Sequence, residues 1–403
     1  MSDDASDKVR TSLQDHLSWW GLKHVTSDHE YFAWQRQDLS PDDLTTLHRL
    51  IKDKRAGDRQ DEIAFYDLTA QPTIYPVLYS QRYEYYEEIA RRVIVELPEA
   101  KEILDVGCGP GILTTFYARQ FPDKRFVGVD RSSVSLARAR QKADALGLRN
   151  VYFECLDIER DPCSQAYDLV VATHALLQAE QDPGLPSQSW RTFERGHSPE
   201  QQVAFEQRTG LRLRLDRLSQ AVRERGRMIV FEKARQLARR VPFQRALAAR
   251  GFRQTKPPEL IRYRTVEDVV DDGPFYVLEK GPHRSLDWDE SPEPDEGPVL
   301  RRETASADAS DTETPLYENH WPSAQRAWEQ LHDRSVIQES TSEESGGRQV
   351  HVERGRAEGY HYLYCANTFD QRQLVLIESA RAALLDQYYL DITAGIPRET
   401  PES

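Results

Sequence analysis

The residues best placed to do chemistry lie in one short run, Glu102–Gly111, with the sequence EILDVGCGPG. Its first half, which contains Asp105, has the apolar character of a buried strand. Gly107, Gly109 and Gly111 follow at alternate positions and predict a tight turn before a helix. Because glycine has no Cβ, the backbone of such a turn can pass close to a ligand. Open α/β sheets bind cofactors at this place, beyond the carboxyl end of a strand.

The spacing of the glycines excludes two common ligand-binding loops. The dinucleotide fingerprint G-x-G-x-x-G needs a glycine at position 112, which is Ile112 here. The phosphate-binding P-loop needs G-x-x-x-x-G-K-[ST], and Gly107 does not begin such a run. The run instead resembles the first motif of class I S-adenosylmethionine-dependent methyltransferases. This resemblance extends over about residues 60–281.

Later segments agree with the resemblance. The apolar run RFVGVD ends in Asp130, about twenty residues after the glycines, where a carboxylate can accept both hydroxyls of a ribose. Further strands are expected at 151–155, 167–172 and 226–232, and a closing antiparallel pair near 258–263 and 275–279. Strands that alternate with helices predict an α/β fold. We expect a doubly wound, mostly parallel seven-stranded sheet of the Rossmann-like methyltransferase type.

The resemblance also implies which residues bind S-adenosyl-L-methionine. The family has an acid near the adenine, which is Asp157 here, and the glycine turn with Asp105 at the methionine end. The helix before the glycine strand closes over that end in related enzymes, so Tyr75, Tyr79 or Arg82 could reach the methionine carboxylate. Tyr75 and its neighbours also form an aromatic stripe of the kind that fills a core. The full expected set is Tyr75, Arg82, Asp105, Gly107, Cys108, Gly109, Gly111, Asp130, Arg131, Asp157, Ile158 and Thr173.

The sequence gives little indication of which methyl acceptor the protein would use. Amino-methylating relatives have Asn or Asp followed by Pro-Pro and an aromatic residue after the fourth strand. Here that place reads Ala-Thr-His-Ala-Leu, which disfavours that branch. His174 lies at this edge of the sheet, and imidazole titrates in the range useful for acid–base chemistry. We therefore expect His174 to be catalytic or to contact substrate, with a structural, hydrogen-bonded histidine as the alternative.

The composition narrows the classes of protein to which this chain could belong. The 403 residues carry a net charge of −14, 30% are charged, and the mean hydropathy is −0.71. No signal peptide or membrane span is expected. The four cysteines form no C-x-x-C pair, so neither zinc nor a disulfide framework is implied, and a reducing cytoplasm is the expected compartment. We expect no metal, and His351 and His361 are taken as surface residues. Salt adaptation and ordinary acidic solubility both fit the charge.

Four segments are expected along the chain. They are an N-terminal helical cap (1–60), the methyltransferase domain (61–283), an acidic linker (284–315) and a small α+β module (316–403) that resembles no family. In the cap we expect helices at 8–20 and 40–56. In the module we expect helices at 322–332 and 379–390, and strands at 349–353, 360–364 and 373–377.

Three functions stay open. The favoured one is a methyltransferase that acts on a small molecule. The stretch Arg191–Arg250 has 15 Arg or Lys and six Asp or Glu, a local charge of +9, which keeps an RNA substrate as an alternative. The third is a cofactor-binding regulator or scaffold without turnover. The sequence assigns neither the acceptor nor the oligomeric state.

Overall fold

The computed structural model describes residues 3–56, 59–177, 182–266, 268–281, 287–301, 315–344 and 347–394. The chain forms two compact units. The first consists of residues 1–182, 203–235 and 243–288, and the second of residues 183–202, 236–242 and 289–403. Within the described ranges, no helix is both long and apolar enough to cross a membrane.

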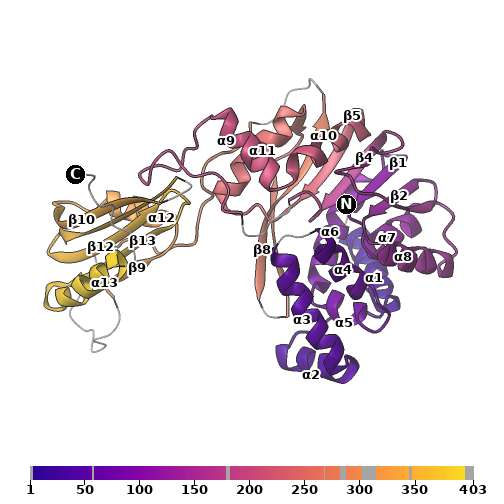
Figure 1. The fold of residues 1–403 in the computed structure, drawn as a ribbon, viewed down its shortest axis with the longest axis horizontal. Helices are drawn as coiled ribbons and strands as arrows, with labels where there is room; N and C mark the ends of the chain where they lie inside the picture. The colour runs from indigo at the N-terminus through magenta and orange to yellow at the C-terminus, as the bar shows by residue number, and fades with distance from the viewer. Residues whose placement is uncertain are drawn as a thin grey trace. The chain divides into compact units, whose positions relative to one another are not determined.

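The first unit is built on a mixed sheet (Figure 1). In the described part of the chain it has eight strands in the order β3-β2-β1-β4-β5-β8-β6, with β7 paired to β8. The strands β1 to β5 are parallel, whereas β8 runs antiparallel to β5 and also pairs with β6 and β7. The strands are β1 (Glu102–Val106), β2 (Arg125–Asp130), β3 (Val151–Cys155), β4 (Tyr167–Thr173), β5 (Val222–Phe231), β6 (Phe252–Gln254), β7 (Glu259–Arg264) and β8 (Val269–Lys280).

This topology confirms the doubly wound, mostly parallel sheet. The expected seven strands become eight because the closing segment forms three strands rather than two. The helices that connect the strands are α7 (Ile112–Gln120), α8 (Ser133–Ala145), α9 (Pro199–Arg208), α10 (Leu211–Ala221) and α11 (Leu237–Ala249). Parallel strands place their carboxyl ends at one edge, so the loops after β1, β2, β3 and β4 meet there.

Six helices precede the sheet within the described residues. They are α1 (Asp3–Trp19), α2 (Asp28–Asp38), α3 (Pro41–Ala56), α4 (Arg59–Thr69), α5 (Tyr75–Ser80) and α6 (Tyr83–Glu96). The helices expected at 8–20 and 40–56 correspond to α1 and α3. The sequence reasoning missed α2 because only Tyr31 of that helix is buried, which leaves a weak apolar pattern.

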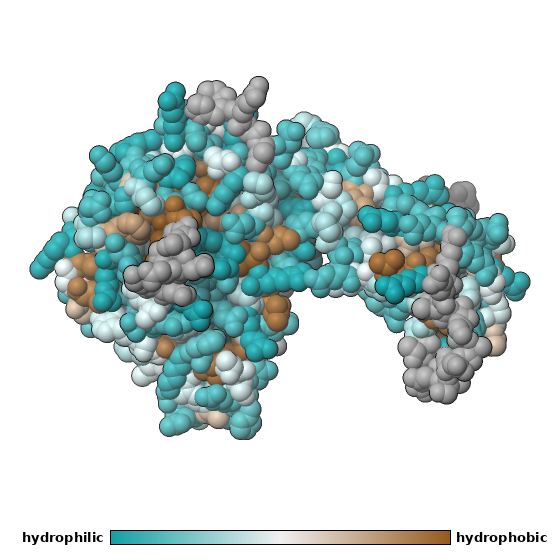
Figure 2. Space-filling model, turned by 180° about the vertical axis from the view of Figure 1, so that it is seen from behind, coloured by the Kyte–Doolittle hydropathy of each residue, from teal (hydrophilic) through white to brown (hydrophobic). Residues whose placement is uncertain are grey.

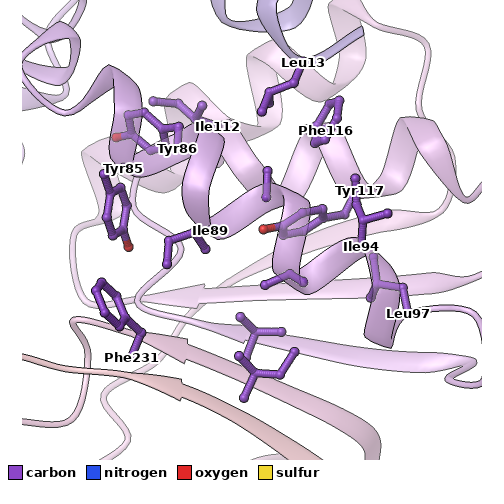
Figure 3. Close-up of a cluster of buried hydrophobic side chains, with 14 of the residues drawn as sticks. Leu13, Tyr85, Tyr86, Ile89, Ile94, Leu97, Ile112, Phe116, Tyr117 and Phe231 are labelled. Carbon is purple, nitrogen blue, oxygen red and sulfur yellow. The ribbon is translucent and has the colours of Figure 1, made fainter. Parts of the chain in front are cut away.

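The N-terminal helices share one core with the sheet. Figure 3 shows Leu13 of α1, Ile89 of α6, Phe116 of α7 and Phe231 of β5 in a single buried cluster. Each of these side chains is at most 2% exposed. Burying one such side chain contributes about 1.5–3 kcal/mol. Removing the helical cap would therefore uncover the core of the first unit.

The second unit is a five-stranded antiparallel sheet in the order β10-β11-β12-β13-β9. The helix α12 packs on β13, and α13 packs on β11 and β12. The expected strands fall within β11, β12 and β13, whereas β10 was missed because its side chains are polar and largely exposed. The elements are β9 (Tyr317–Asn319), α12 (Ser323–Glu329), β10 (Ser335–Glu344), β11 (Arg348–Ala357), β12 (Tyr360–Asn367), β13 (Arg372–Glu378) and α13 (Ala382–Ala394).

An insertion between β4 and α9 contributes to this second unit. The indole of Trp190 stacks on the imidazole of His351, with ring centroids 3.6 Å apart and planes 1° from parallel. Arg195 pairs with Asp370. The domain limits drawn from the sequence did not include this insertion in the C-terminal module, and as limits of independently folding domains they stay predictions.

Part of the segment expected as a linker is described, and its residues from 289 onward belong to the second unit. A carboxylate oxygen of Asp295 accepts the backbone N–H of Ser323 at 2.6 Å, at the start of α12. Glu293 pairs with Arg240. The acidic stretch 302–314 lies outside the described residues. On the face seen in Figure 2, hydrophilic side chains predominate and the hydrophobic patches are small, as the charged composition predicts.

Candidate active site

The glycine turn after β1 depends on three left-handed residues. The φ angles are 69° at Gly107, 54° at Gly109 and 84° at Gly111. A Cβ added at Gly107 would lie 2.9 Å from the Cβ of Ala175, and one at Gly111 would lie 2.8 Å from that of Ala139. At Gly109 it would meet nothing within 4 Å. Packing therefore requires glycine at 107 and 111, whereas Gly109 faces open space, as a turn that cradles a ligand requires.

Asp130 connects this turn to the end of β2. Its Oδ2 accepts the backbone N–H of Gly109 at 2.9 Å, and its Oδ1 accepts that of Ser132 at 2.8 Å. Burial raises the pKa of this carboxyl, while the hydrogen bonds oppose that shift. The backbone of Arg131 also hydrogen-bonds this carboxylate. A carboxylate has about four acceptor positions, so Asp130 keeps capacity for a further donor such as a ribose hydroxyl.

Asp105 lies within β1, beneath the turn. Its Oδ2 accepts the hydroxyl of Thr114 at 2.5 Å. Burial is the main cause that raises its pKa to about 7, and the charge of Asp130 adds to this effect. Close to neutral pH, Asp105 is therefore divided between the charged and uncharged forms.

The other residues expected near the cofactor follow β2 and β3. Asp157 is buried and accepts the backbone N–H of Glu159 at 3.1 Å. Ile158 beside it is buried as well. Arg131 pairs with Glu62 of α4 at 2.7 Å, so it braces the helical cap. The backbone N–H of Cys108 donates to the carbonyl of Val129 at 3.1 Å, which fixes the turn on β2.

Tyr75 and Arg82 differ in their surroundings. The ring of Tyr75 packs edge-on against Trp20 at 5.9 Å, in the common core. This contact fits the alternative of a core aromatic residue. The guanidinium of Arg82 lies 5.3 Å from the ring centroid of Tyr85, at the start of α6. Among the residues that the structure describes, it has no hydrogen-bond or ion-pair partner. A half-buried guanidinium in that state is suited to a carboxylate.

His174 lies directly after β4 with a left-handed φ of 54°. Its backbone N–H donates to the carbonyl of Phe231 at 2.8 Å, which secures this strained position. The imidazole stacks on Tyr85 with ring centroids 5.1 Å apart and planes 20° from parallel. The hydroxyl of Tyr85 in turn hydrogen-bonds Thr173. The ring of His174 is therefore held at the carboxyl edge of the sheet.

A carboxylate lies beside the imidazole of His174. The Nε2 of His174 lies 3.0 Å from the Oδ2 of Asp272, and the hydroxyl of Tyr263 donates to the same oxygen. Burial lowers the pKa of His174 to about 4 despite the opposing effect of Asp272. The imidazole is thus neutral at pH 7. Both of its ring nitrogens are buried, and neither makes a hydrogen bond of good geometry within the described part of the chain, although Nε2 faces Asp272.

Glu232, at the end of β5, organises the loop that follows His174. Its Oε1 accepts the backbone N–H groups of Ala175 and Leu176 at 2.7 and 2.8 Å, and its Oε2 that of Leu177 at 3.3 Å. Burial raises the pKa of Glu232 to about 7. The sequence analysis missed this residue, although an acid that ends a predicted apolar strand is the signal that identified Asp130.

The arginines of the basic stretch 191–250 are largely paired with carboxylates. Within the described residues at least eight of them make ion pairs, which leaves less positive charge for an external polyanion than the sequence indicates. The pairs are Arg195–Asp370, Arg208–Asp182, Arg214–Glu159, Arg223–Asp168, Arg227–Glu96, Arg235–Asp271, Arg240–Glu293 and Arg250 with both Glu206 and Asp216.

Comparison with known proteins agrees with this geometry. Residues 97–238 match the family model of a methyltransferase domain. A trans-aconitate 2-methyltransferase of Variovorax paradoxus is 39% identical over 106 residues, which are 26% of this chain and 38% of that protein. A malonyl-[acyl-carrier protein] O-methyltransferase of Acetivibrio thermocellus is 42% identical over 71 residues, 18% of this chain and 24% of that protein. The matches thus span less than half the length of these relatives.

Two further similarities are weaker or shorter. A tRNA (guanine-N(7)-)-methyltransferase of Rubrobacter xylanophilus is 38% identical over 84 residues, 20% of this chain and 35% of that protein. Among solved structures, an N-methyltransferase of Bradyrhizobium japonicum in complex with S-adenosyl-L-homocysteine aligns with a TM-score of 0.35 and 15% identity. That alignment covers 50% of this chain and 88% of the other.

Proposed function

We propose, from the premise that residues 97–238 are a class I methyltransferase domain that uses S-adenosyl-L-methionine, that this protein methylates a small molecule on oxygen. The observation that carries this proposal is the left-handed glycine turn whose Gly109 N–H is bound by Asp130. The names of two relatives specify small or carrier-bound carboxylic acids as acceptors, which supports the same class here.

The residues at the carboxyl edge fit the cofactor. Asp130 would hold its ribose, Asp157 its adenine, and Asp105 and Arg82 would lie at its methionine end. The cofactor, when bound, supplies a methyl group on a positively charged sulfur, so the protein needs mainly to align an acceptor with it. Arg82 suits the methionine carboxylate because the described residues offer its guanidinium no other ion-pair partner.

His174 is the residue that we assign to the acceptor. We assign the imidazole proton to Nε2, which lies 3.0 Å from Oδ2 of Asp272, so that Nδ1 would take a proton from an acceptor hydroxyl. Asp272 would then stabilise the imidazolium that forms, and the hydroxyl of Tyr263 keeps Asp272 in place. Oxygen is favoured as the acceptor atom because the sequence after β4 lacks the motif of the amino-methylating branch.

The ion pairs of the stretch 191–250 weigh against the RNA alternative. A regulator without turnover would bind the cofactor without consuming it. It would therefore form no S-adenosyl-L-homocysteine, whereas a methyltransferase that acts on a small molecule or on RNA would.

A transfer assay can separate the three functions. Purified full-length protein is incubated with S-adenosyl-L-methionine labelled in the methyl group, against small carboxylic and hydroxy acids, acyl carriers and total RNA. We expect S-adenosyl-L-homocysteine to form with a small hydroxy acid, and its formation to fall at least 100-fold in His174→Gln because the hydroxyl must lose its proton. Transfer to RNA alone, or tight cofactor binding without product across the panel, would contradict the proposal.

A further inference from the structure

A polar cluster lies on one face of the sheet in the second unit. His351 and Glu353 are two residues apart on β11, so their side chains point to the same face. In the antiparallel register, Thr341 of β10 lies opposite His351, and Glu339 lies opposite Glu353. The four side chains therefore form a square across two neighbouring strands.

Three of these residues bring together possible metal ligands. One nitrogen of His351 and one carboxylate oxygen each from Glu339 and Glu353 all lie within 4.8 Å of one another. His351 and Glu353 are buried, at 1% and 4% exposure, whereas Glu339 is exposed. An ion bound here would thus have buried ligands on one side and an open side toward solvent.

The ring of His351 is fixed in one orientation. Its Nδ1 lies 2.7 Å from the hydroxyl oxygen of Thr341, and its face stacks on Trp190. The Nε2 is buried and has no hydrogen-bond partner among the described residues. The nearest carboxylate oxygen, Oε2 of Glu353, is 3.5 Å away, which is beyond the usual 2.7–3.2 Å of such a bond. A buried nitrogen in this state points to a missing ligand.

Glu353 is oriented by its other oxygen. Its Oε1 accepts the hydroxyl of Tyr362 and, at 3.3 Å, the indole N–H of Trp328. Its Oε2 is thereby turned toward the Nε2 of His351. Both buried ligand atoms are thus aimed at one point by neighbours that hold the opposite side of each group, which is how ligands of metal sites are positioned.

We propose that Glu339, His351 and Glu353 bind one divalent first-row transition metal ion. One imidazole with two carboxylates is a donor set that suits zinc and its neighbours, manganese included. Two ionised carboxylates and a neutral imidazole carry a charge of −2, which a divalent ion balances. The Nδ1–H of His351 donates to Thr341 in this arrangement and leaves the lone pair of Nε2 for the ion. The ion would join the exposed edge strand β10 to β11.

The sequence analysis expected no metal and took His351 and His361 as surface residues. Both are in fact buried, at 1% and 7% exposure. His361 lies on the neighbouring strand β12, opposite Arg356 of β11 and therefore on the other face of the sheet. The pairing of β10 with β11 brings Glu339 close to His351. The spacing of possible metal ligands along the sequence does not reveal this pairing.

The test uses the full-length protein, freed of metal with a chelator. Zinc chloride is titrated calorimetrically, and Mn²⁺ binding is followed by electron paramagnetic resonance because manganese has little affinity for the cysteines. We expect one equivalent of either ion per chain. Glu339→Gln should weaken binding at least tenfold and His351→Gln should abolish it.

Two matched variants serve as controls. Glu343→Gln changes another exposed glutamate on the same face of β10, and His361→Gln changes a histidine on the opposite face. Both should bind as the parent does. The proposal is overturned if neither ion binds stoichiometrically, or if Glu339→Gln binds as tightly as Glu343→Gln. Should His351→Gln fail to fold, Glu339→Gln still decides the question, since its side chain is exposed.

Discussion

Nε2 of His174 lies 3.0 Å from Oδ2 of Asp272. The histidine directly follows the parallel strand β4, and the aspartate lies within the antiparallel strand β8 of the same sheet. The pair stands at the carboxyl edge of the parallel strands, where we propose that the cofactor binds. In the proposed mechanism Asp272 orients Nε2–H and Nδ1 takes the proton of the acceptor.

The pairing of His174 with Asp272 predicts an unusual dependence of kcat/KM on pH. Burial lowers the pKa of His174 to about 4, so kcat/KM should stay level from pH 8 to about 5 and fall with a midpoint near 4. Asp272 favours the imidazolium, so Asp272→Asn should lower kcat/KM and move the midpoint to still lower pH. Initial rates across this range are the measurement. A midpoint near 6.5, the ordinary value for histidine, would show that His174 does not act as the base.

The same histidine predicts how stability depends on pH. Its pKa is about 4 in the fold and 6.5 in the unfolded chain, so between these values the unfolded chain binds more protons. The stability contribution is complete above pH 6.5 and is lost as the pH falls toward 4. Between pH 7 and pH 4 the parent should therefore lose about 3 kcal/mol more stability than His174→Gln does, at 1.36 kcal/mol per pKa unit. Equal differences at the two pH values in urea unfolding would contradict the assignment.

The three glycines of the turn should respond differently to alanine. Gly109→Ala meets no neighbour within 4 Å, so it should fold with a cost of about 1 kcal/mol for the left-handed φ and lose affinity for S-adenosyl-L-homocysteine. Gly107→Ala, which would press on Ala175, should lose stability as well. Thermal unfolding with and without the ligand separates these effects.

Gly147 provides the control for this series. It has a φ of 67°, and an added Cβ there also meets nothing within 4 Å, but it lies at the end of α8 away from the turn. Gly147→Ala should cost similar stability and leave the ligand-induced shift unchanged. If Gly109→Ala retains the full shift, the turn does not approach the ligand.

Glu232→Gln tests the support of the loop after His174. The amide keeps one acceptor oxygen but replaces the other with a donor, so it cannot satisfy all three backbone N–H groups that the carboxylate binds. We expect a loss of about 1–3 kcal/mol in the free energy of unfolding. Urea denaturation of Glu224→Gln, whose side chain is 77% exposed, supplies the control. Equal stability of the two variants would show that Glu232 is dispensable.

Local patterns predicted the parts of this protein that depend on neighbours in sequence. The turn at Gly107–Gly111 and the acid at Asp130 both follow apolar strands directly, and each could be read without knowledge of the sheet. The parallel order of the first five strands followed from the alternation of strands and helices. The expected sheet was therefore correct for its parallel part, β1 to β5.

The features that the sequence did not predict depend on how segments far apart in the chain pair with one another. Asp272 and Tyr263 reach His174 from the antiparallel strands, and nothing in their own surroundings in sequence indicates that contact. β10 has few apolar side chains because it lies at a sheet edge, so its pattern resembles a loop. The stacking of Trp190 on His351 joins an insertion to a segment far along the chain, and composition carries no signal of such a pairing.

Calorimetric titration of S-adenosyl-L-homocysteine into the parent, Asp130→Asn and Asp123→Asn tests the central claim most directly. Asp123 is an exposed acid before β2, so its variant controls for the loss of one charge. We predict one binding site in the parent and in Asp123→Asn. In Asp130→Asn we predict at least a 100-fold loss, because two hydrogen bonds from ribose to a charged acceptor contribute about 3–6 kcal/mol. No binding by the parent, or equal affinity in Asp130→Asn, would contradict the assignment of this edge as the cofactor site.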